Sequence, residues 1–390
     1  MTRIVQLDAV RGLAVIGIAW MNVYVFALPL QAYYNPAAYG LESDIDRWVW
    51  LISFVFVEDK FRTLFALLFG AGCLILLEKD EERPWRAHIA RMGVLLVIGV
   101  LHSTLFASND VLRAYALAGL ALPFIRHLSA PALYAVAIGL LVVHVGTGIV
   151  IFGSGVLDFY AGRMSTEAVL IAERNFGTNA GAIEYAMRLG QEGFAERIAR
   201  RSAGIPGQLS TLMASLPINL AAMVLGMALW RDRMLAGAWR TFRMQRLAAV
   251  CAAIALPALL ALGGWVADAG FPGVLVGPVA LVLSAPFDML LGLAYALLVM
   301  ALLNESGVIT KRLAAVGRLS LTNYVATSVI FAALFASWGL GWFASVSRAG
   351  AFALSFVPIA AMLIWSPLWL RIWGQGPLER LWRGAARVLS

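Results

Sequence analysis

Apolar stretches of about 18 or more residues recur along the whole chain, and they limit its fold more than any other feature. A helix needs about 20 consecutive apolar residues to cross the hydrocarbon core of a bilayer. Only 13% of the 390 residues are charged, whereas soluble domains carry about 25%. Short segments with alternating polarity, which are typical of a membrane β-barrel, do not occur. The pattern predicts an all-α, polytopic transmembrane helical bundle.

About ten spans are expected, and together they form a single integral membrane domain. The apolar stretch at 47–57 either extends the second span or lies at the interface, and the Pro- and Gly-containing stretch at 272–283 predicts a broken or re-entrant segment. The domain, 1–390, divides into an N-terminal five-span half at 1–152, an external polar and amphipathic segment at 153–209, and a C-terminal five-span half at 210–390. The spans are expected near 12–30, 61–78, 91–107, 110–127, 131–152, 210–230, 247–267, 284–303, 319–339 and 350–370.

Lysine and arginine gather in alternate loops, and this asymmetry predicts that both termini are cytoplasmic in a bacterial inner membrane. The net charge of +8 follows from this loop bias, and no basic patch interleaved with aromatic residues indicates nucleic-acid binding. Membrane lipid and a small-molecule substrate are the expected partners, with a second copy of the chain as a further candidate. The cytoplasmic set includes Arg3, Lys79, Arg83, Arg91, Arg126, Arg231, Arg318 and Arg371.

Metal chemistry is not expected. The four histidines are too few and too scattered for a centre built on imidazole. Cys73 and Cys251 lie in apolar spans and are expected to be small buried hydrophobic residues. No Walker loop, nucleophile elbow or zinc-protease motif occurs in the chain.

Polar residues within the first span raise the question of a site inside the membrane, because Asp or Arg at bilayer depth costs roughly 2.5–3.5 kcal/mol. Arg11 and Asn22 are eleven residues apart, close to three helical turns, so both lie on one face. Asp8 lies about one turn before Arg11 and can pair with it. Two interpretations remain open: a structural ion pair, or a cytoplasmic site where Arg11 binds a phosphate or carboxylate.

A second group lies around the external turn between the third and fourth spans. His102 is expected in the outer half of the membrane, either as a hydrogen-bonded packing residue or as a proton-transfer group. Asp110 is expected to be the N-cap of the fourth span and to pair with Arg113 one turn later. The remaining candidate substrate-binding residues are Glu58 and Arg62 at the external mouth, Asp288 in the eighth span, and Arg318, Asn323 and Tyr324 at the start of the ninth.

Several motifs along the chain occur together in one family, and the resemblance covers essentially the whole sequence. The motifs are Leu7-Asp8-x-x-Arg11-Gly12 with Asn22; Asp59-Lys60-Phe61-Arg62; Ile98-Gly99-Val100-Leu101-His102; Asp110-Val111-Leu112-x-x-Tyr115; Gly317-Arg318-x-Ser320-Leu321-Thr322-Asn323-Tyr324; and Trp373-Gly374-x-Gly376-Pro377-Leu378-Glu379. In these motifs the chain resembles the YeiB family of bacterial inner-membrane proteins, whose C-terminal half is a named domain of unknown function.

This resemblance implies a function, because the family is similar at fold level to membrane acyltransferases. Among these are the O-acyltransferases of bacterial surface glycans and the lysosomal heparan-glucosaminide N-acetyltransferase. Arg11 matches the first-span arginine of the O-acyltransferases, but Asn22 stands where they carry histidine.

The implied activity is acyl transfer from acetyl-CoA or another acyl-CoA, held by Arg11 and Arg318, to an external hydroxyl or amine. His102, oriented by Asp110, would supply the base that Asn22 cannot. The alternative from the same residues is a carrier or exporter of a small polar or anionic metabolite.

Overall fold

The computed structural model describes residues 4–79 and 84–389, and within these ranges the regular elements are all helical. Arg3 and Arg83, which the sequence assigns to the cytoplasmic charge, lie outside the described residues. The α-helices are α1 Val5–Ala27, α2 Asp44–Phe56, α3 Lys60–Lys79, α4 Pro84–Leu105, α5 Val111–Gly119, α6 Leu122–Ile125, α7 Ala130–Tyr160, α8 Thr166–Phe176, α9 Ala180–Gly190, α10 Phe194–Ala203, α11 Leu209–Arg231, α12 Thr241–Asp268, α13 Gly273–Pro278, α14 Ala285–Leu302, α15 Val308–Arg318, α16 Ser320–Phe335, α17 Arg348–Leu354, α18 Phe356–Trp373 and α19 Pro377–Leu389. The shorter elements are η1 Leu30–Tyr33, η2 Pro36–Ala38 and η3 Pro206–Gln208, which are 3-10 helices, and η4 Val279–Leu283, which is a π-helix.

Eight helical segments in the described part of the chain are long and apolar enough to cross a membrane, and the bent pair α15 and α16 raises the number to nine. The expected number was about ten. The difference lies at 110–127, where a break after Gly119 leaves α5 and α6 each too short to count as a span. These two helices still return the chain along the bundle, because Arg126 donates to the carbonyl oxygen of Leu77, near the end of α3, at 3.2 Å.

Two other expected features are present. The stretch at 47–57 joins the second span, which runs over Asp44–Lys79 with a break between α2 and α3. The stretch at 272–283 is a broken segment, as predicted, in which α13 ends at Pro278 and continues as the π-helix η4. A proline inside a helix removes one backbone hydrogen bond, and π-helical turns occur mostly as local insertions, often at functional sites.

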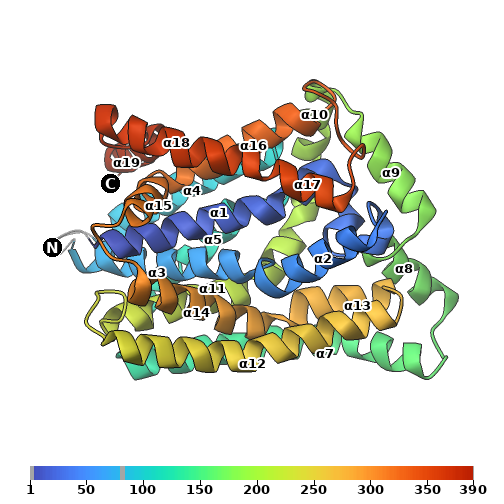
Figure 1. Ribbon diagram of the computed structural model, residues 1–390, viewed down its shortest axis with the longest axis horizontal. Coiled ribbons are helices and arrows are strands. Elements are labelled where there is room, and N and C mark those ends of the chain that lie inside the picture. The colour runs from blue at the N-terminus through green and yellow to red at the C-terminus, as the bar shows by residue number, and fades with distance from the viewer. Residues whose placement is uncertain (1–3, 80–83, 390) are drawn as a thin grey trace.

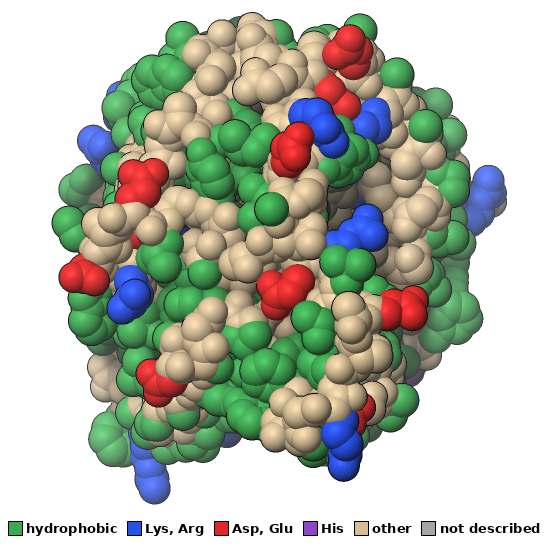
Figure 2. All heavy atoms as spheres, turned by 90° about the vertical axis from the view of Figure 1, so that its right-hand side faces the viewer, with side chains coloured by type: hydrophobic (Ala, Val, Ile, Leu, Met, Phe, Trp, Pro, Cys, Tyr) green, Lys and Arg blue, Asp and Glu red, His purple; other side chains and the backbone are tan. Residues whose placement is uncertain are grey.

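The beginning of α1 and the C-terminal helix α19 lie at the same end of the bundle, as Figure 1 shows. Helices α8, α9 and α10 lie at the opposite end and contain most of the segment expected at 153–209. Helix α7 continues to Tyr160, so its last two turns also fall in that range. Figure 2 looks onto this end, where acidic and basic side chains are scattered among apolar ones. The orientation of the two ends in a membrane stays a prediction.

Helices α1 and α15 pack closely because glycines occupy their contact. A Cβ atom on Gly317 would overlap the carbonyl oxygen of Asp8, and one on Gly12 would overlap that of Leu313. Small residues allow such close approach between membrane helices. The first and the fifth of the sequence motifs thus meet at this contact, at the end of the bundle where the termini lie.

Helices α15 and α16 meet at a bend of 82° near Leu319. The bend exposes the first backbone N–H groups of α16, which need partners. Glu379 of α19 supplies them, since its Oε1 accepts from the backbone N–H of Leu321 at 2.8 Å and of Thr322 at 3.1 Å. The C-terminal motif therefore fixes the start of the helix that carries Tyr324.

Candidate functional site

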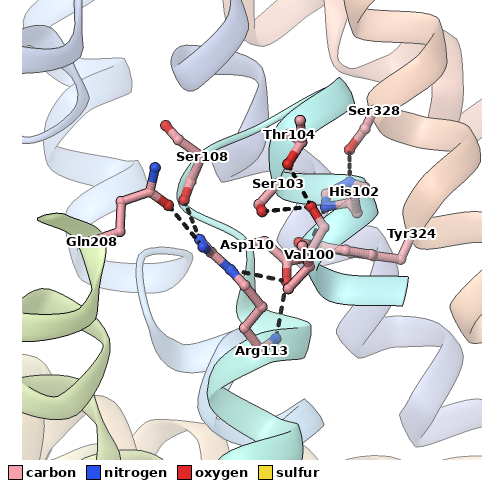
Figure 3. A network of polar contacts seen from close by, with 10 residues as sticks. All are labelled: Val100, His102, Ser103, Thr104, Ser108, Asp110, Arg113, Gln208, Tyr324 and Ser328. Carbon is pink, nitrogen blue, oxygen red and sulfur yellow. Dashed lines mark hydrogen bonds and ion pairs between the residues drawn. The ribbon is translucent and has the colours of Figure 1, made fainter. Parts of the chain in front are cut away.

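Five side chains from α4, α5 and α16 form a buried hydrogen-bonded group, which we call the histidine cluster: His102, Asp110, Arg113, Tyr324 and Ser328 (Figure 3). His102 Nδ1 lies 2.8 Å from Asp110 Oδ1, and His102 Nε2 lies 2.9 Å from Ser328 Oγ. The Tyr324 hydroxyl donates to Asp110 Oδ1 at 3.2 Å. His102 is 3% exposed and Ser328 is fully buried.

The hydrogen bonds determine which nitrogen of His102 carries the proton when the ring is neutral. Asp110 also accepts the Tyr324 hydroxyl and the backbone N–H of Arg113, at 3.0 Å, which is the pattern of an ionised carboxylate. An ionised carboxylate only accepts, so Nδ1 of His102 carries the hydrogen. Nε2 then has a free lone pair, which accepts the hydroxyl of Ser328. This is the arrangement of a hydroxyl, a base and an orienting acid.

The local sequence explains why Asp110 reaches His102. Helix α4 ends at Leu105, and a short turn brings the chain back so that Asp110 caps α5, as expected, by accepting from the N–H of Arg113. The carboxylate of Asp110 therefore binds the helix start with one oxygen and His102 with the other. Arg113 also forms the expected ion pair, with Nε 3.9 Å from Asp110 Oδ2.

The guanidinium of Arg113 is held by two further acceptors. It donates to the carbonyl oxygen of Ser108 at 2.6 Å and to Gln208 Oε1 at 2.8 Å. Gln208 precedes α11, so this contact ties the segment at 153–209 to the histidine cluster (Figure 3). The positive charge beside Asp110 offsets part of the cost of burying its carboxylate.

A small cavity of about 70 Å³ lies beside the histidine cluster, and Tyr324 is among its lining residues. Its polar lining includes Asn22, Asp59, Arg62 and Tyr33, and Arg62 Nε pairs with Asp59 Oδ1 at 2.8 Å. Loss of hydration raises the pKa of the Tyr33 hydroxyl well above its ordinary value, so this group remains a hydrogen-bond donor. Asn22 and Arg62, predicted from separate motifs, thus line one cavity with Tyr324.

A larger hollow, of about 470 Å³, lies at the end of the bundle formed by α8 and α9. Gln31, Arg174, Asn179 and Tyr185 are among its lining residues. None of the residues that line it belongs to the histidine cluster or to the small cavity.

The expected pair at the start of the first span is present. Arg11 Nη1 lies 3.1 Å from Asp8 Oδ1, and Asp8 is buried. Arg318 donates to the carbonyl oxygen of Gly374 at 2.9 Å, across the contact between α15 and the segment after α18. Both arginines lie where α1 and α15 meet, at the same end as the termini, and apart from His102 near the far end of α4.

Asp288 and Glu58 belong to a second buried group, which we call the lysine cluster: Glu58, Lys60, Asp288 and Arg348. Lys60 is 0% exposed, its Nζ lies 2.6 Å from Asp288 Oδ1, and it also donates to the carbonyl oxygen of Phe54. Glu58, 4% exposed, lies within electrostatic range of the other three charges. Arg348 donates to the carbonyl oxygens of Ala32, at 2.8 Å, and Tyr33, at 3.0 Å.

Asn323 lies in a separate polar group from both clusters. Its Nδ2 donates to the carbonyl oxygen of Val316 at 3.0 Å, and its Oδ1 accepts from Trp365 Nε1 at 2.9 Å. These contacts link α15, α16 and α18 around the 82° bend. They leave Asn323 turned away from Tyr324 and the cavity that Tyr324 lines.

Sequence reasoning did not select Ser328, Lys60 or Arg348 as site residues. Ser328 follows Tyr324 by four positions, so the helical period places both on one face of α16. That spacing was available as a signal for Ser328. The partners of Lys60 and Arg348 lie on other elements, and no local spacing connects them. Within residues 4–79 and 84–389, no three His, Cys, Asp or Glu side chains converge as metal ligands.

The apolar helices define a multi-pass, membrane-type helical protein, and the known proteins that it is similar to are of unknown function. Residues 209–388 match the family described as "Protein of unknown function (DUF418)". The chain is 33% identical over 400 residues to the uncharacterized protein YeiB of Escherichia coli (strain K12), covering 98% of this chain and 96% of that protein. It is 26% identical to the uncharacterized protein YxaH of Bacillus subtilis (strain 168), covering 98% and 94%.

The chain therefore belongs to the YeiB family, as its motifs predicted. No solved structure matches it. The similarity to membrane acyltransferases is a separate prediction, which these comparisons do not reach.

Proposed function

We propose that this multi-pass protein transfers an acyl group, such as acetyl, from a cytoplasmic acyl-CoA to an external hydroxyl or amine. The observation that carries the proposal is the contact of 2.8 Å between His102 Nδ1 and Asp110 Oδ1, which directs the Nε2 lone pair away from the carboxylate. A histidine oriented in this way is suited to accept the proton of an attacking hydroxyl or amine. It supplies the base that Asn22 cannot.

The remaining parts of the proposal assign a role to each end of the bundle. Arg11 and Arg318 would bind the phosphates of the CoA donor at the end where the termini lie, by charge-assisted hydrogen bonds. The acyl chain would reach the small cavity, which offers the space of about two water molecules and so favours a short acyl group. The site would lie in a bacterial inner membrane, with lipid around it and the acceptor entering from outside. A homodimer remains a candidate assembly.

The first experiment measures binding of acetyl-CoA to the purified full-length protein in detergent. We expect saturable binding that weakens in Arg11→Ala by about tenfold or more, since a charge-assisted contact to a phosphate contributes roughly 1.5–3 kcal/mol. Arg163→Ala is the matched control, because Arg163 is an exposed arginine next to the end of α7. Absence of acetyl-CoA binding to the intact protein contradicts the proposal.

Transport of a small polar or anionic metabolite is the second candidate, and the lysine cluster favours it. Asp288 lies in the first turn of α14, directly after the π-helix η4, and its charge is buried with that of Lys60. Buried charges and interrupted helices are common in membrane carriers. Uptake of radiolabelled acetate into proteoliposomes, abolished in both Arg62→Ala and Asp110→Asn, would favour transport. If the protein shows no acetate uptake but does transfer acetyl from acetyl-CoA to glucosamine, the transferase is favoured.

A further inference from the structure

We infer that Ser328 is the nucleophile that carries the acyl group as a covalent ester between donor and acceptor. This inference rests on the proposed acyl transfer and adds to it an intermediate and the residue that forms it. Ser328 Oγ is 2.9 Å from His102 Nε2, and His102 Nδ1 is 2.8 Å from Asp110 Oδ1. Helix α16 and the α4–α5 hairpin, which are more than 200 positions apart in the sequence, thus form a serine, histidine and aspartate series in the order that activates a hydroxyl.

The hydrogen bonds of this series define the direction of proton transfer, from the Ser328 hydroxyl to His102. Asp110 only accepts, so His102 donates from Nδ1 and accepts at Nε2. Ser328 is fully buried on α16, and its hydroxyl contacts Nε2 of His102 on α4. Figure 3 shows Ser328 and His102 facing each other from α16 and α4. A buried hydroxyl that donates to a histidine lone pair is arranged for proton transfer.

Tyr324 contacts both this series and the cavity. It lines the cavity of about 70 Å³, its hydroxyl donates to Asp110 at 3.2 Å, and its ring centre lies 4.9 Å from that of His102. Ser328 follows it by one helical turn on the same face of α16. For the acyl group to pass from the cavity to Ser328 Oγ, the Tyr324 ring would have to move aside.

The chemistry proceeds in two balanced steps. In the first, Ser328 Oγ attacks the thioester carbonyl carbon of the acyl-CoA while its proton moves to His102 Nε2; the carbon–sulfur bond breaks, and the leaving thiolate takes the proton from His102. In the second, the acceptor hydroxyl or amine gives its proton to Nε2 and attacks the ester carbonyl carbon. The ester bond to Ser328 breaks, and the proton returns from His102 to Oγ. Asp110 stabilises the imidazolium in both steps.

The test uses the purified full-length protein in detergent with acetyl-CoA labelled in its acetyl group and no acceptor. After acid quenching, the label on the protein is counted and mapped by mass spectrometry of its peptides. We expect label on the peptide that contains Ser328, and a loss of about tenfold or more in Ser328→Ala. Ser103→Ala is the matched control, because Ser103 is also a buried serine next to His102 but donates to the carbonyl oxygen of Val100 at 2.9 Å.

Two further measurements separate a chemical effect from a folding defect. Thermal unfolding in detergent compares Ser328→Ala with the parent chain. Ser328→Cys keeps a nucleophile of similar size, and we expect it to hold the label as a thioester that neutral hydroxylamine removes. Retention of this label supports the role of position 328 even where the alanine variant is unstable.

The outcomes separate this inference from the proposed function on which it rests. Acetyl transfer to glucosamine at the parental rate in Ser328→Ala would overturn the covalent step and leave the proposed function intact. Label on the parent chain at a residue other than 328 also overturns it. If the folded parent protein shows neither label nor acetyl transfer to glucosamine, both proposals are overturned.

Discussion

The histidine cluster and the lysine cluster are both buried, but they satisfy their polar atoms in different ways. In the histidine cluster the polar side-chain atoms of His102, Asp110 and Ser328 all have hydrogen-bond partners, while Nε of Arg113 is buried and makes no hydrogen bond within the described residues. In the lysine cluster, Oε1 of Glu58 and Nε of Arg348 are buried and make no hydrogen bond within the described part of the chain. The first cluster is ordered by directional hydrogen bonds, whereas the second is held mainly by charge.

This difference separates a group that can move a proton from a group that holds helices together. Directional bonds fix which atom donates and which accepts, as proton transfer requires. In a buried ion pair such as Lys60 with Asp288, the attraction of the two charges compensates for their lost hydration. Removing one partner leaves the other charge buried without compensation. Changes in the histidine cluster should therefore lower activity more than stability, and changes in the lysine cluster should do the reverse.

The largest expected effect is that of Asp110→Asn on acyl transfer. The amide keeps the size of the side chain and can still cap α5, because asparagine is a good N-cap. It can also donate to Nδ1, which shifts the hydrogen of His102 to Nε2 and removes the base. We expect the rate of acetyl transfer from acetyl-CoA to glucosamine to fall by about 10³–10⁴-fold. The loss of stability should be smaller than in a variant that breaks the Lys60–Asp288 pair, because Arg113 keeps its hydrogen bonds to Ser108 and Gln208.

The control for this change is Asp158→Asn, since Asp158 is an exposed aspartate paired with Arg163 at 3.4 Å near the end of α7. It should retain the parental rate. An Asp110→Asn protein that unfolds readily but keeps the parental rate per folded molecule would reverse the assignment of the two clusters.

Lys60→Met should give the largest loss of stability. Methionine fills similar space, but it leaves Asp288 as a buried carboxylate without its partner at 2.6 Å. Removing one member of a buried ion pair typically lowers the free energy of unfolding by about 3–5 kcal/mol. Thermal or denaturant unfolding of the purified protein in detergent measures this change.

The double variant Lys60→Met with Asp288→Leu decides whether charge is the cause. With both charges removed, most of the lost stability should return, because apolar replacement of a buried pair is often neutral or better. A double variant as unstable as Lys60→Met would mean that packing around Lys60, and not its charge, holds this region together.

The sequence predicted the contacts that lie within one turn or one hairpin. Asp8 with Arg11 and Asp110 with Arg113 are separated by three positions, and both pairs are present. His102 and Asp110 are eight positions apart, across the short turn between α4 and α5, and their contact follows from that turn. The periodicity of apolar residues also predicted the helical bundle, apart from the break between α5 and α6.

The long-range part of the site could not be predicted in this way. Ser328 is 226 positions from His102, and Lys60 is paired with a residue 228 positions away (60 against 288). Such contacts depend on which helices pack together and at what rotation. For Ser328 that rotation depends on the bend before α16, and hydropathy reports neither this bend nor the glycine contact between α1 and α15.

Tyr324→Phe is expected to have a smaller effect that distinguishes two roles of this side chain. The variant loses the hydrogen bond to Asp110 but keeps the ring between the cavity and His102. One buried hydrogen bond contributes about 0.5–1.5 kcal/mol, so we expect a rate reduced by about three- to tenfold. Tyr324→Ala also removes the aromatic ring, and the labelled ester on Ser328 should then hydrolyse faster in water.

The smallest effect is expected for Arg188→Ala in α9, and it gives the scale for the comparison of the two clusters. Arg188 pairs with Glu184 one turn earlier, at 3.3 Å, but the two side chains are 67% and 70% exposed. Water and salt screen such a pair, so its removal should change the free energy of unfolding by less than about 0.5 kcal/mol. If Arg188→Ala lost as much stability as Lys60→Met, unfolding in detergent would be reporting the release of the segment at 153–209 and not the burial of charge. A negligible change, by contrast, means that the loss in Lys60→Met measures what burial adds to an ion pair.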